Sequence, residues 1–227
     1  MISNSQCWVR ERCKKANSCS DSFCIKLFKL NELCNLAMLT EDQRQKKKLW
    51  LDGSGVDRDA FTFLKSVEDN VEKFVKDGSN IYIYSYITGN GKTAWALRIL
   101  NSYLEKIWYK SDIVCRALFV NVPRFLISLK ENIGEYSPYY NQIKNCILDA
   151  DLVVFDEIGT KVATSFEVEH LLSIINARVD NKKSNIYTSN LGPEELRKSV
   201  GDRMYSRIIN TSTEVMFRGA DKRSVKQ

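Results

Sequence analysis

A glycine-rich turn at residues 85–93 reads Ser-Tyr-Ile-Thr-Gly-Asn-Gly-Lys-Thr and lies between an apolar run and a helix-like segment. When such a turn joins a strand to a helix, several backbone N–H groups point at one place, where the helix N-terminus adds positive potential. This arrangement is typical of a phosphate site. Lys92 would reach the terminal phosphates of a nucleotide, and Thr93 would bind the Mg²⁺ that bridges them. The rest of the cradle would be Gly89, Asn90 and Gly91.

The turn departs from the usual Gly-x4-Gly-Lys-Thr spacing, because Tyr86 stands where the first glycine would fall. A tyrosine is sterically feasible at the end of a strand as long as its φ stays negative. The departure bears on nucleotide affinity, whereas Lys92 and both later glycines keep their roles. The tripeptide Gly-Lys-Thr is common, so the interpretation depends on the rest of the chain.

Two adjacent carboxylates follow a run of β-branched and aromatic residues at 152–155. The run predicts a buried strand with Asp156 and Glu157 at its carboxyl tip. Asp156 would hold Mg²⁺ together with Thr93, directly or through water, and Glu157 would polarise the attacking water. The alternative is an ordinary Asp-Glu turn after a strand. The phosphate loop upstream favours the catalytic interpretation.

Further polar residues fall at ends of predicted elements. Asn190 follows the strand expected at 185–189, where it would orient the attacking water. Arg203 and Arg207 are four residues apart and therefore lie on one helix face, which in isolation is most often a solvated face. Residues 214–223 are expected to form a final strand followed by a short basic tail that includes Arg223.

The elements that would position these residues alternate between strand and helix from residue 81 onward. This alternation predicts an α/β domain, a parallel sheet with helices on both faces. One helix is expected to precede it over residues 58–77, where apolar and charged positions recur at helical spacing. The other expected strands are 81–84 and 116–122, and the other expected helices are 94–110, 123–129 and 139–148.

The composition is that of an ordinary globular protein, with 44% hydrophobic and 27% charged residues among 227. No apolar run approaches the roughly 18 to 20 residues of a membrane helix, and no basic-then-apolar segment opens the chain. We therefore expect a cytosolic protein with reduced thiols and no membrane partner. The net charge is +6, and residues 1–50 hold ten Lys or Arg against five Asp or Glu. This segment could attract nucleic acid or an acidic protein face, or be a solvated surface.

Four of the seven cysteines fall within the first 24 residues. Four thiolates close in sequence can surround one Zn²⁺ and order a segment that is too short for its own core. The spacing lacks a tight Cys-x2-Cys pair, so unligated cysteines packed on the following helix, or an iron-sulfur cluster, are alternatives. That helix is predicted from residue 23 by an apolar stripe at steps of three and four. The cysteines are Cys7, Cys13, Cys19 and Cys24.

In this order, the motifs resemble the AAA+ ATPases of the DnaC/DnaI type, the loaders of replicative helicases, and in particular their phage or mobile-element versions. The resemblance implies an AAA+ P-loop NTPase fold over residues 53–227, with a parallel sheet flanked by helices, in a bacterial cytosol. It also implies a small Cys-rich, mainly helical module with a linker at residues 1–52. The segments that carry it are 89–93, 118–123, 152–159, 187–191, 201–208 and 217–223.

The resemblance assigns roles to several of these residues. Asn190 would be the first sensor and Arg223 the second. Arg207 would reach the nucleotide of a neighbouring subunit, with Arg203 as the alternative for this role. Hydrolysis would then depend on self-association of ATP-bound subunits, because the positive charge that stabilises the transition state comes from the neighbouring subunit.

The function that these roles imply is an ATP- and Mg²⁺-dependent loader of a DnaB-type helicase in DNA replication. Residues 1–50 would bind the helicase, and basic and aromatic groups would grip single-stranded DNA with little sequence preference. One alternative is a transposition helper ATPase of the IstB kind, which does not need a metal-bound N-terminus. The other is a non-hydrolysing adaptor that sequesters the host helicase. The adaptor is disfavoured by the intact Lys92, Thr93, Asp156 and Glu157, while Tyr86 leaves it open.

Overall fold

The computed structural model describes residues 7–10, 13, 24–44, 55–134, 138–160 and 163–222. Within them, five strands form one sheet in the order β2-β3-β4-β1-β5, and every neighbouring pair runs parallel. The predicted parallel sheet is confirmed. The strands are β1 (Asn80–Tyr84), β2 (Ala117–Asn121), β3 (Leu152–Asp156), β4 (Ser184–Ser189) and β5 (Ser212–Met216).

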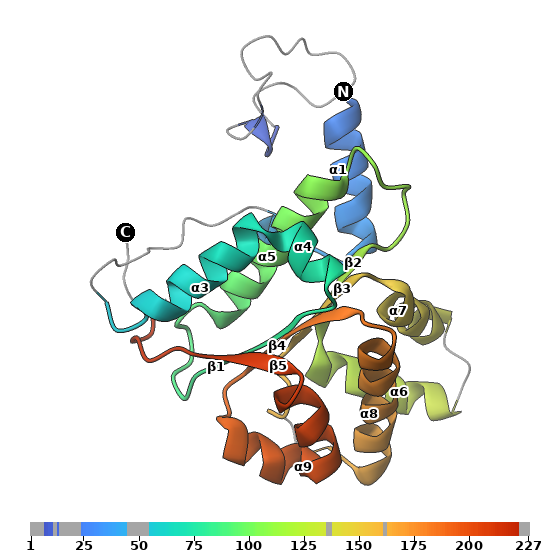
Figure 1. Cartoon of the computed structure of the whole chain (residues 1–227). Coiled ribbons are helices and arrows are strands. Elements are labelled where there is room, and N and C mark those ends of the chain that lie inside the picture. Colours follow the sequence, from blue (N-terminus) through green and yellow to red (C-terminus); the bar gives the residue numbers. More distant parts are fainter. Residues whose placement is uncertain are drawn as a thin grey trace.

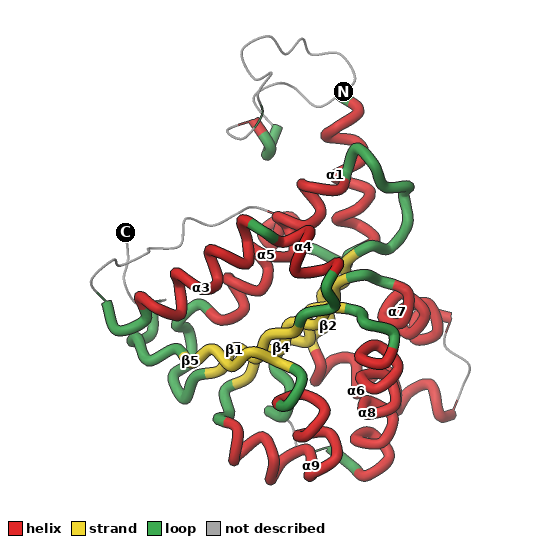
Figure 2. Tube along the Cα trace, viewed as in Figure 1, coloured by secondary structure: helices red, strands yellow, loops and turns green. Residues whose placement is uncertain are grey.

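Helices cover both faces of this sheet, as Figures 1 and 2 show. One layer contains α1 (Ile25–Leu36), α2 (Glu41–Arg44), α3 (Arg58–Asp69), α4 (Val71–Lys76) and α5 (Lys92–Ile107). The opposite layer contains α6 (Val122–Gly134), α7 (Pro138–Asp149), α8 (Ser165–Asp180) and α9 (Pro193–Ile209). None of the helices described here is long and apolar enough to cross a membrane.

The strand pattern explains the two layers. Successive side chains of a strand point to opposite faces, so a central strand needs apolar residues at every position. In β1, Ile81 and Ile83 join the core under α5, whereas Tyr82 joins the core that α6, α7, α8 and α9 cover. All three side chains are fully buried. The continuous apolar runs of the sequence are therefore the interior strands of a covered sheet.

The single helix predicted over residues 58–77 is wrong, because the chain forms α3 and α4 with a break at Asn70. Asn70 has φ −109° and ψ 28°, and its side-chain Nδ2 donates to the carbonyl oxygen of Ser66 at 3.0 Å. An asparagine that bonds the preceding turn in this way competes with the backbone bonds of a continuing helix. The break redirects the chain so that Val71 and Val75 are buried.

Helix α1 is part of the same core as the sheet. Leu33, Cys34 and Ala37 belong to the core cluster that contains α5, and the carbonyl oxygen of Ala37 accepts a hydrogen bond from Phe119 N of β2 at 3.1 Å. Deleting residues 1–50 would therefore open the core. The domain boundary after residue 52 stays a prediction.

Candidate nucleotide-binding site

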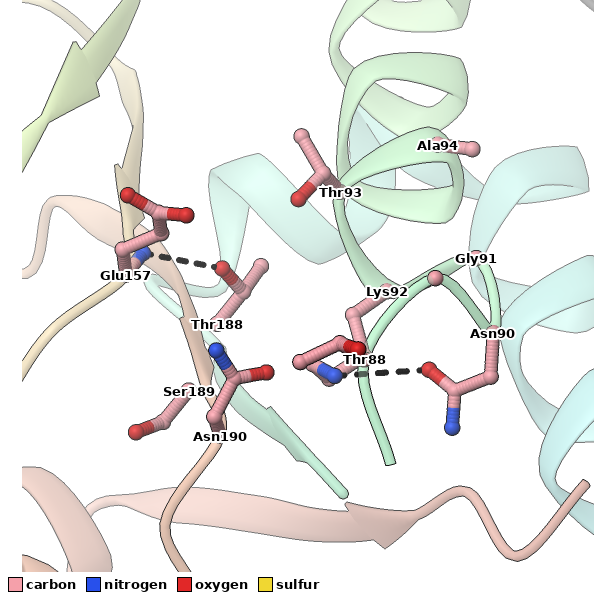
Figure 3. A pocket seen from close by; sticks show the side chains of 11 residues that line it. Thr88, Asn90, Gly91, Lys92, Thr93, Ala94, Glu157, Thr188, Ser189 and Asn190 are labelled. Atoms are coloured by element: carbon pink, nitrogen blue, oxygen red, sulfur yellow. Dashed lines mark hydrogen bonds between the residues drawn. The ribbon is translucent and has the colours of Figure 1, made fainter. Parts of the chain in front are cut away.

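A cavity of about 520 Å³ opens at the carboxyl ends of β1, β3 and β4. Ligands of open parallel sheets bind at this edge, where the connections diverge. The structure thus brings together the glycine-rich loop, the acidic tip of β3 and the tip of β4 (Figure 3). The lining residues are Thr88, Gly89, Asn90, Gly91, Lys92, Thr93, Ala94, Glu157, Thr188, Ser189 and Asn190.

The loop between β1 and α5 has the conformation of a phosphate cradle. Gly89 and Gly91 adopt φ values of 73° and 104°, a region that side chains disfavour. The Ser85 Oγ accepts hydrogen bonds from Ile87 N at 3.0 Å and from Asn90 Nδ2 at 2.6 Å. Because α5 begins at Lys92, its N-terminus opens into the cavity and favours an anion there.

The side chain of Lys92 lines the cavity and bonds to residues of this loop. It is largely buried, and its Nζ donates to the carbonyl oxygen of Ile87 at 3.0 Å and to Asn90 Oδ1 at 3.3 Å. To reach a phosphate, the ammonium group would exchange these two neutral acceptors for phosphate oxygens. Charged acceptors form stronger hydrogen bonds with an ammonium group, so the exchange is favourable.

Asp156 is a buried carboxylate whose hydrogen-bond donors are hydroxyls. Its Oδ1 accepts from Thr188 Oγ1 at 2.6 Å and from Thr93 Oγ1 at 2.8 Å. Burial raises the pKa of Asp156 above its ordinary value, although the two hydroxyls partly oppose this shift. A carboxylate and a hydroxyl oxygen side by side are the hard donors that Mg²⁺ prefers. Thr93 and Asp156 therefore fit the predicted magnesium site.

Glu157 lies at the edge of the cavity in a strained backbone conformation. Its φ is 61°, which is uncommon for a residue with a side chain. Two contacts hold it there: its N–H donates to Thr188 Oγ1 at 3.1 Å, as Figure 3 shows, and its Oε2 accepts from Asn121 Nδ2 at 3.0 Å. The carboxylate is thus oriented by the neighbouring strands β2 and β4.

Two residues of the site, Thr188 and Asn121, are not among those that the sequence motifs predict. Both are polar residues at or near the carboxyl end of an apolar strand, and β-sheet register places Asn121 opposite Asp156. Their place at the end of an apolar strand is the sequence feature that points to the site. It could not be used without the strand order, because only neighbouring strands bring their tips together.

Replacing Thr188 by valine should destabilise the protein, because the isosteric side chain removes a donor to Asp156 and an acceptor for Glu157 N. We expect the free energy of unfolding to fall by about 1–2 kcal/mol, because the buried Asp156 carboxylate keeps the hydroxyl of Thr93 but loses that of Thr188. Chemical denaturation measures this. Thr213→Val, at an exposed position of β5, is the matched control and should change stability by less than about 0.5 kcal/mol. Equal stabilities of the two variants would contradict the role of Thr188.

Of the other predicted site residues, only Asn190 is found at the cavity of the described chain. Asn190 lines the cavity, and Figure 3 shows its amide between the tip of β4 and the loop. Arg203 and Arg207 do not line it. On α9 they pair with acids of α8, at 3.0 Å to Glu169 and 3.4 Å to Asp180. A role for them at a nucleotide would therefore need a neighbouring subunit, and it stays a prediction; Arg223 lies outside the described residues.

Tyr86 leaves the cradle open. It is not among the positive-φ residues of the described chain, so the steric condition set by its position is met. Its side chain is 58% exposed and does not line the cavity. The phenol instead donates to Glu195 Oε2 on α9 at 3.4 Å. The tyrosine that replaces the first glycine of the motif therefore does not obstruct the site.

Three of the four N-terminal cysteines, Cys7, Cys13 and Cys24, are among the described residues. Cys7 and Cys24 border a small cluster formed by Val9, Leu27 and Leu30. Among the residues that the structure describes, no three His, Cys, Asp or Glu side chains are arranged to hold a metal ion. Cys19 lies outside them, so the zinc site of Cys7, Cys13, Cys19 and Cys24 stays a prediction.

The sheet order, the glycine-rich loop after β1 and the carboxylates at the tip of β3 together define the class. The fold is that of an AAA+ P-loop NTPase.

Comparisons with known proteins agree with this fold. No protein-family model matches the chain. It is 28% identical to the replicative helicase loader DnaC of Escherichia coli (strain K12) over 163 residues, which cover 71% of this chain and 63% of DnaC. The match thus spans less than two thirds of the length of that relative. The resemblance to DnaC-type helicase loaders that the motifs indicated is confirmed.

Solved structures agree on the fold. The crystal structure of the DnaC helicase loader superposes with a TM-score of 0.62 at 21% identity and covers 76% of this chain and 99% of that one. The replication initiator DnaA bound to AMPPCP and single-stranded DNA gives a TM-score of 0.60 at 21% identity and covers 76% of this chain and 49% of the other.

Proposed function

We propose that this protein is an ATP-dependent loader that places a DnaB-type replicative helicase on single-stranded DNA. The observation that carries the proposal is one cavity that Lys92, Thr93 and Glu157 line together, where the Thr93 hydroxyl also donates to Asp156. The similarity to DnaC supports the assignment to helicase loading. The DnaA structure with AMPPCP and single-stranded DNA shows that another protein of this fold binds both kinds of ligand.

ATP would bind with its phosphates on the loop and on Lys92. Thr93 and Asp156 would hold Mg²⁺, which neutralises charge on the phosphates when bound. Glu157 would accept a proton from the attacking water, and Asn190 would orient that water. The missing positive charge would come from Arg207 of a neighbouring ATP-bound subunit, with Arg203 as the alternative and Arg223 as the second sensor.

The helicase would dock on the N-terminal segment. Helix α1 supports this part of the proposal, because its two sides serve different purposes. Leu33 and Cys34 anchor it in the ATPase core, whereas Ile25 and Phe28 are 59% and 44% exposed. Exposed large apolar side chains on an anchored helix are suited to a partner protein.

Ile25→Asp tests the docking. The added charge should weaken binding to a hexameric DnaB-type helicase at least about tenfold, the size expected of a central interface residue. The measurement is co-purification, followed by titration of labelled helicase. Phe166→Asp, at a 52% exposed position of α8, is the control and should bind normally. A point substitution replaces deletion of residues 1–50, which would remove buried core residues. Normal binding of Ile25→Asp would contradict docking on α1.

A further inference from the structure

The chain that follows β5 passes the start of α3 and reaches the phosphate loop at Lys222. We call residues 217–222 the strap; its first part lies beside the start of α3 in Figure 1. Phe217 N donates to the carbonyl oxygen of Tyr84 at 2.8 Å, which continues the pairing of β5 with β1, and Lys222 N donates to the carbonyl oxygen of Gly89 at 3.1 Å. The strap therefore connects the end of β1 to the phosphate loop by a second route.

A buried carboxylate anchors the strap. Asp57 is 5% exposed, and its Oδ1 and Oδ2 accept from Arg218 N at 2.6 Å and Gly219 N at 3.0 Å. Asp57 stands at the N-cap of α3 but makes no side-chain capping bond, although aspartate at that position ordinarily accepts from its own helix. A Cβ on Gly219 would lie 2.5 Å from Asp57 Oδ2. The Asp57 carboxylate thus bonds the strap and not its own helix, and a side chain at position 219 would have to displace it.

The contact of the strap with Gly89 differs from the supports inside the loop. Lys92 holds Ile87 and Asn90 from within the cavity and must release them to reach a phosphate. Lys222 does not line the cavity, so its hydrogen bond can persist when the cavity is filled. Its Nζ lies 4.5 Å from the centre of the Phe61 ring on α3, outside the cavity.

We propose that the Asp57-anchored strap is a positioning element of the nucleotide site, and that it holds Gly89 in its left-handed conformation when Lys92 turns to the nucleotide. This inference rests on the proposed function in taking ATP as the ligand. A loop that is only partly in the binding conformation binds more weakly in proportion to its population. Loss of the strap should therefore weaken nucleotide binding even though Lys92, Thr93 and Asp156 are left unaltered.

Lys222→Pro and Lys222→Ala form the decisive pair. Proline removes the N–H that Gly89 accepts, whereas alanine keeps that N–H and removes only the side chain. Binding of AMPPCP with Mg²⁺ to the full chain is measured by calorimetry. We expect the Kd to rise about tenfold for the proline variant and less than about twofold for alanine. Equal weakening in both would assign the effect to the lysine charge and overturn the proposal.

Asp57→Ala and Gly219→Ala test the anchor from its two sides. Both should weaken AMPPCP binding as Lys222→Pro does, because one removes the acceptors and the other displaces the strap. Asp69→Ala is the matched control: Asp69 is an exposed carboxylate of the same helix that pairs with Lys65, and its loss should leave the Kd unchanged. Thermal unfolding identifies any variant that does not fold.

Amide hydrogen exchange of the nucleotide-free protein tests the strap independently of ATP. The amides of residues 85–91 should exchange faster in Lys222→Pro and Asp57→Ala than in the wild type, and at the wild-type rate in Lys222→Ala and Asp69→Ala. If Lys222→Pro has the hydrogen-exchange rates and the AMPPCP Kd of the wild type, the positioning role of the strap is contradicted. The proposed function is then unaffected. Absence of AMPPCP binding by the wild type would instead overturn the proposed function, while the exchange rates still decide the strap.

Discussion

Glu157→Gln is expected to lower the rate of ATP hydrolysis by about a hundredfold or more and to leave ATP affinity nearly unchanged. Glutamine keeps the size of the side chain and can still accept from Asn121 Nδ2, which donates to the Glu157 carboxylate at 3.0 Å. What it loses is the ability to take a proton from water. Phosphate release in assembled protein and equilibrium binding of a fluorescent ATP analogue measure the two quantities separately.

The matched control is Glu194→Gln, which removes a carboxylate from an exposed position of α9 away from the cavity. It should hydrolyse ATP at the wild-type rate. If Glu157→Gln hydrolyses ATP as fast as this control, Glu157 does not activate the water. If the wild type shows no turnover with or without single-stranded DNA and helicase, the ATPase part of the proposed function fails.

Mixing Glu157→Gln with Arg207→Ala extends this test to the neighbouring subunit. Each variant alone should be inactive in an assembly that uses Arg207 in trans. In the mixture, some interfaces join an intact Glu157 to an intact Arg207, so part of the activity should return. The same mixture made with Arg203→Ala tests the alternative arginine. An inactive mixture in both cases would contradict the trans-acting role.

Lys92→Ala should remove most of the nucleotide affinity. The Lys92 ammonium is largely buried and lies within hydrogen-bond reach of the loop's own acceptors, so an incoming triphosphate would form a desolvated charge pair with it. Losing one member of such a pair costs about 2–5 kcal/mol, which corresponds to roughly a 30- to 5,000-fold higher Kd. Calorimetric titration with AMPPCP and Mg²⁺ gives the value.

Lys198→Ala is the control for charge alone, because Lys198 is an exposed lysine on α9. Its Kd should match that of the wild type. Thermal unfolding of nucleotide-free Lys92→Ala checks that the loop variant is folded. A wild-type Kd for folded Lys92→Ala would show that the nucleotide binds elsewhere and that the glycine-rich loop is not its phosphate site.

The site was predictable from sequence where its signals are local. The glycine positions, Lys92 and Thr93 lie within one turn between a strand and a helix, and Asp156 and Glu157 directly follow a buried run. Short-range geometry suffices for such features, because left-handed glycines and period-2 burial concern residues that are close along the chain. Tyr86 could be judged in the same way, since only its own φ decided whether it fits.

The single helix over residues 58–77 failed for a related reason. Apolar spacing continues through Asn70, and the pattern does not show whether a polar side chain faces solvent or bonds the preceding turn. Asn70 does the latter. Which of these two hydrogen-bond arrangements forms depends on how the following residues pack against the sheet. That packing belongs to the tertiary structure.

By itself, then, the sequence determined the cradle, the acidic tip and the alternation that makes a parallel sheet, because each depends on neighbours along the chain. Only the tertiary structure decided the strand order. That order set Asn121 opposite Asp156 and Thr188 against both carboxylate residues. It also set β5 beside β1, so that Asp57 accepts from a backbone N–H 161 residues away. Contacts of this separation follow from how two helical layers cover one sheet, and no local pattern encodes them.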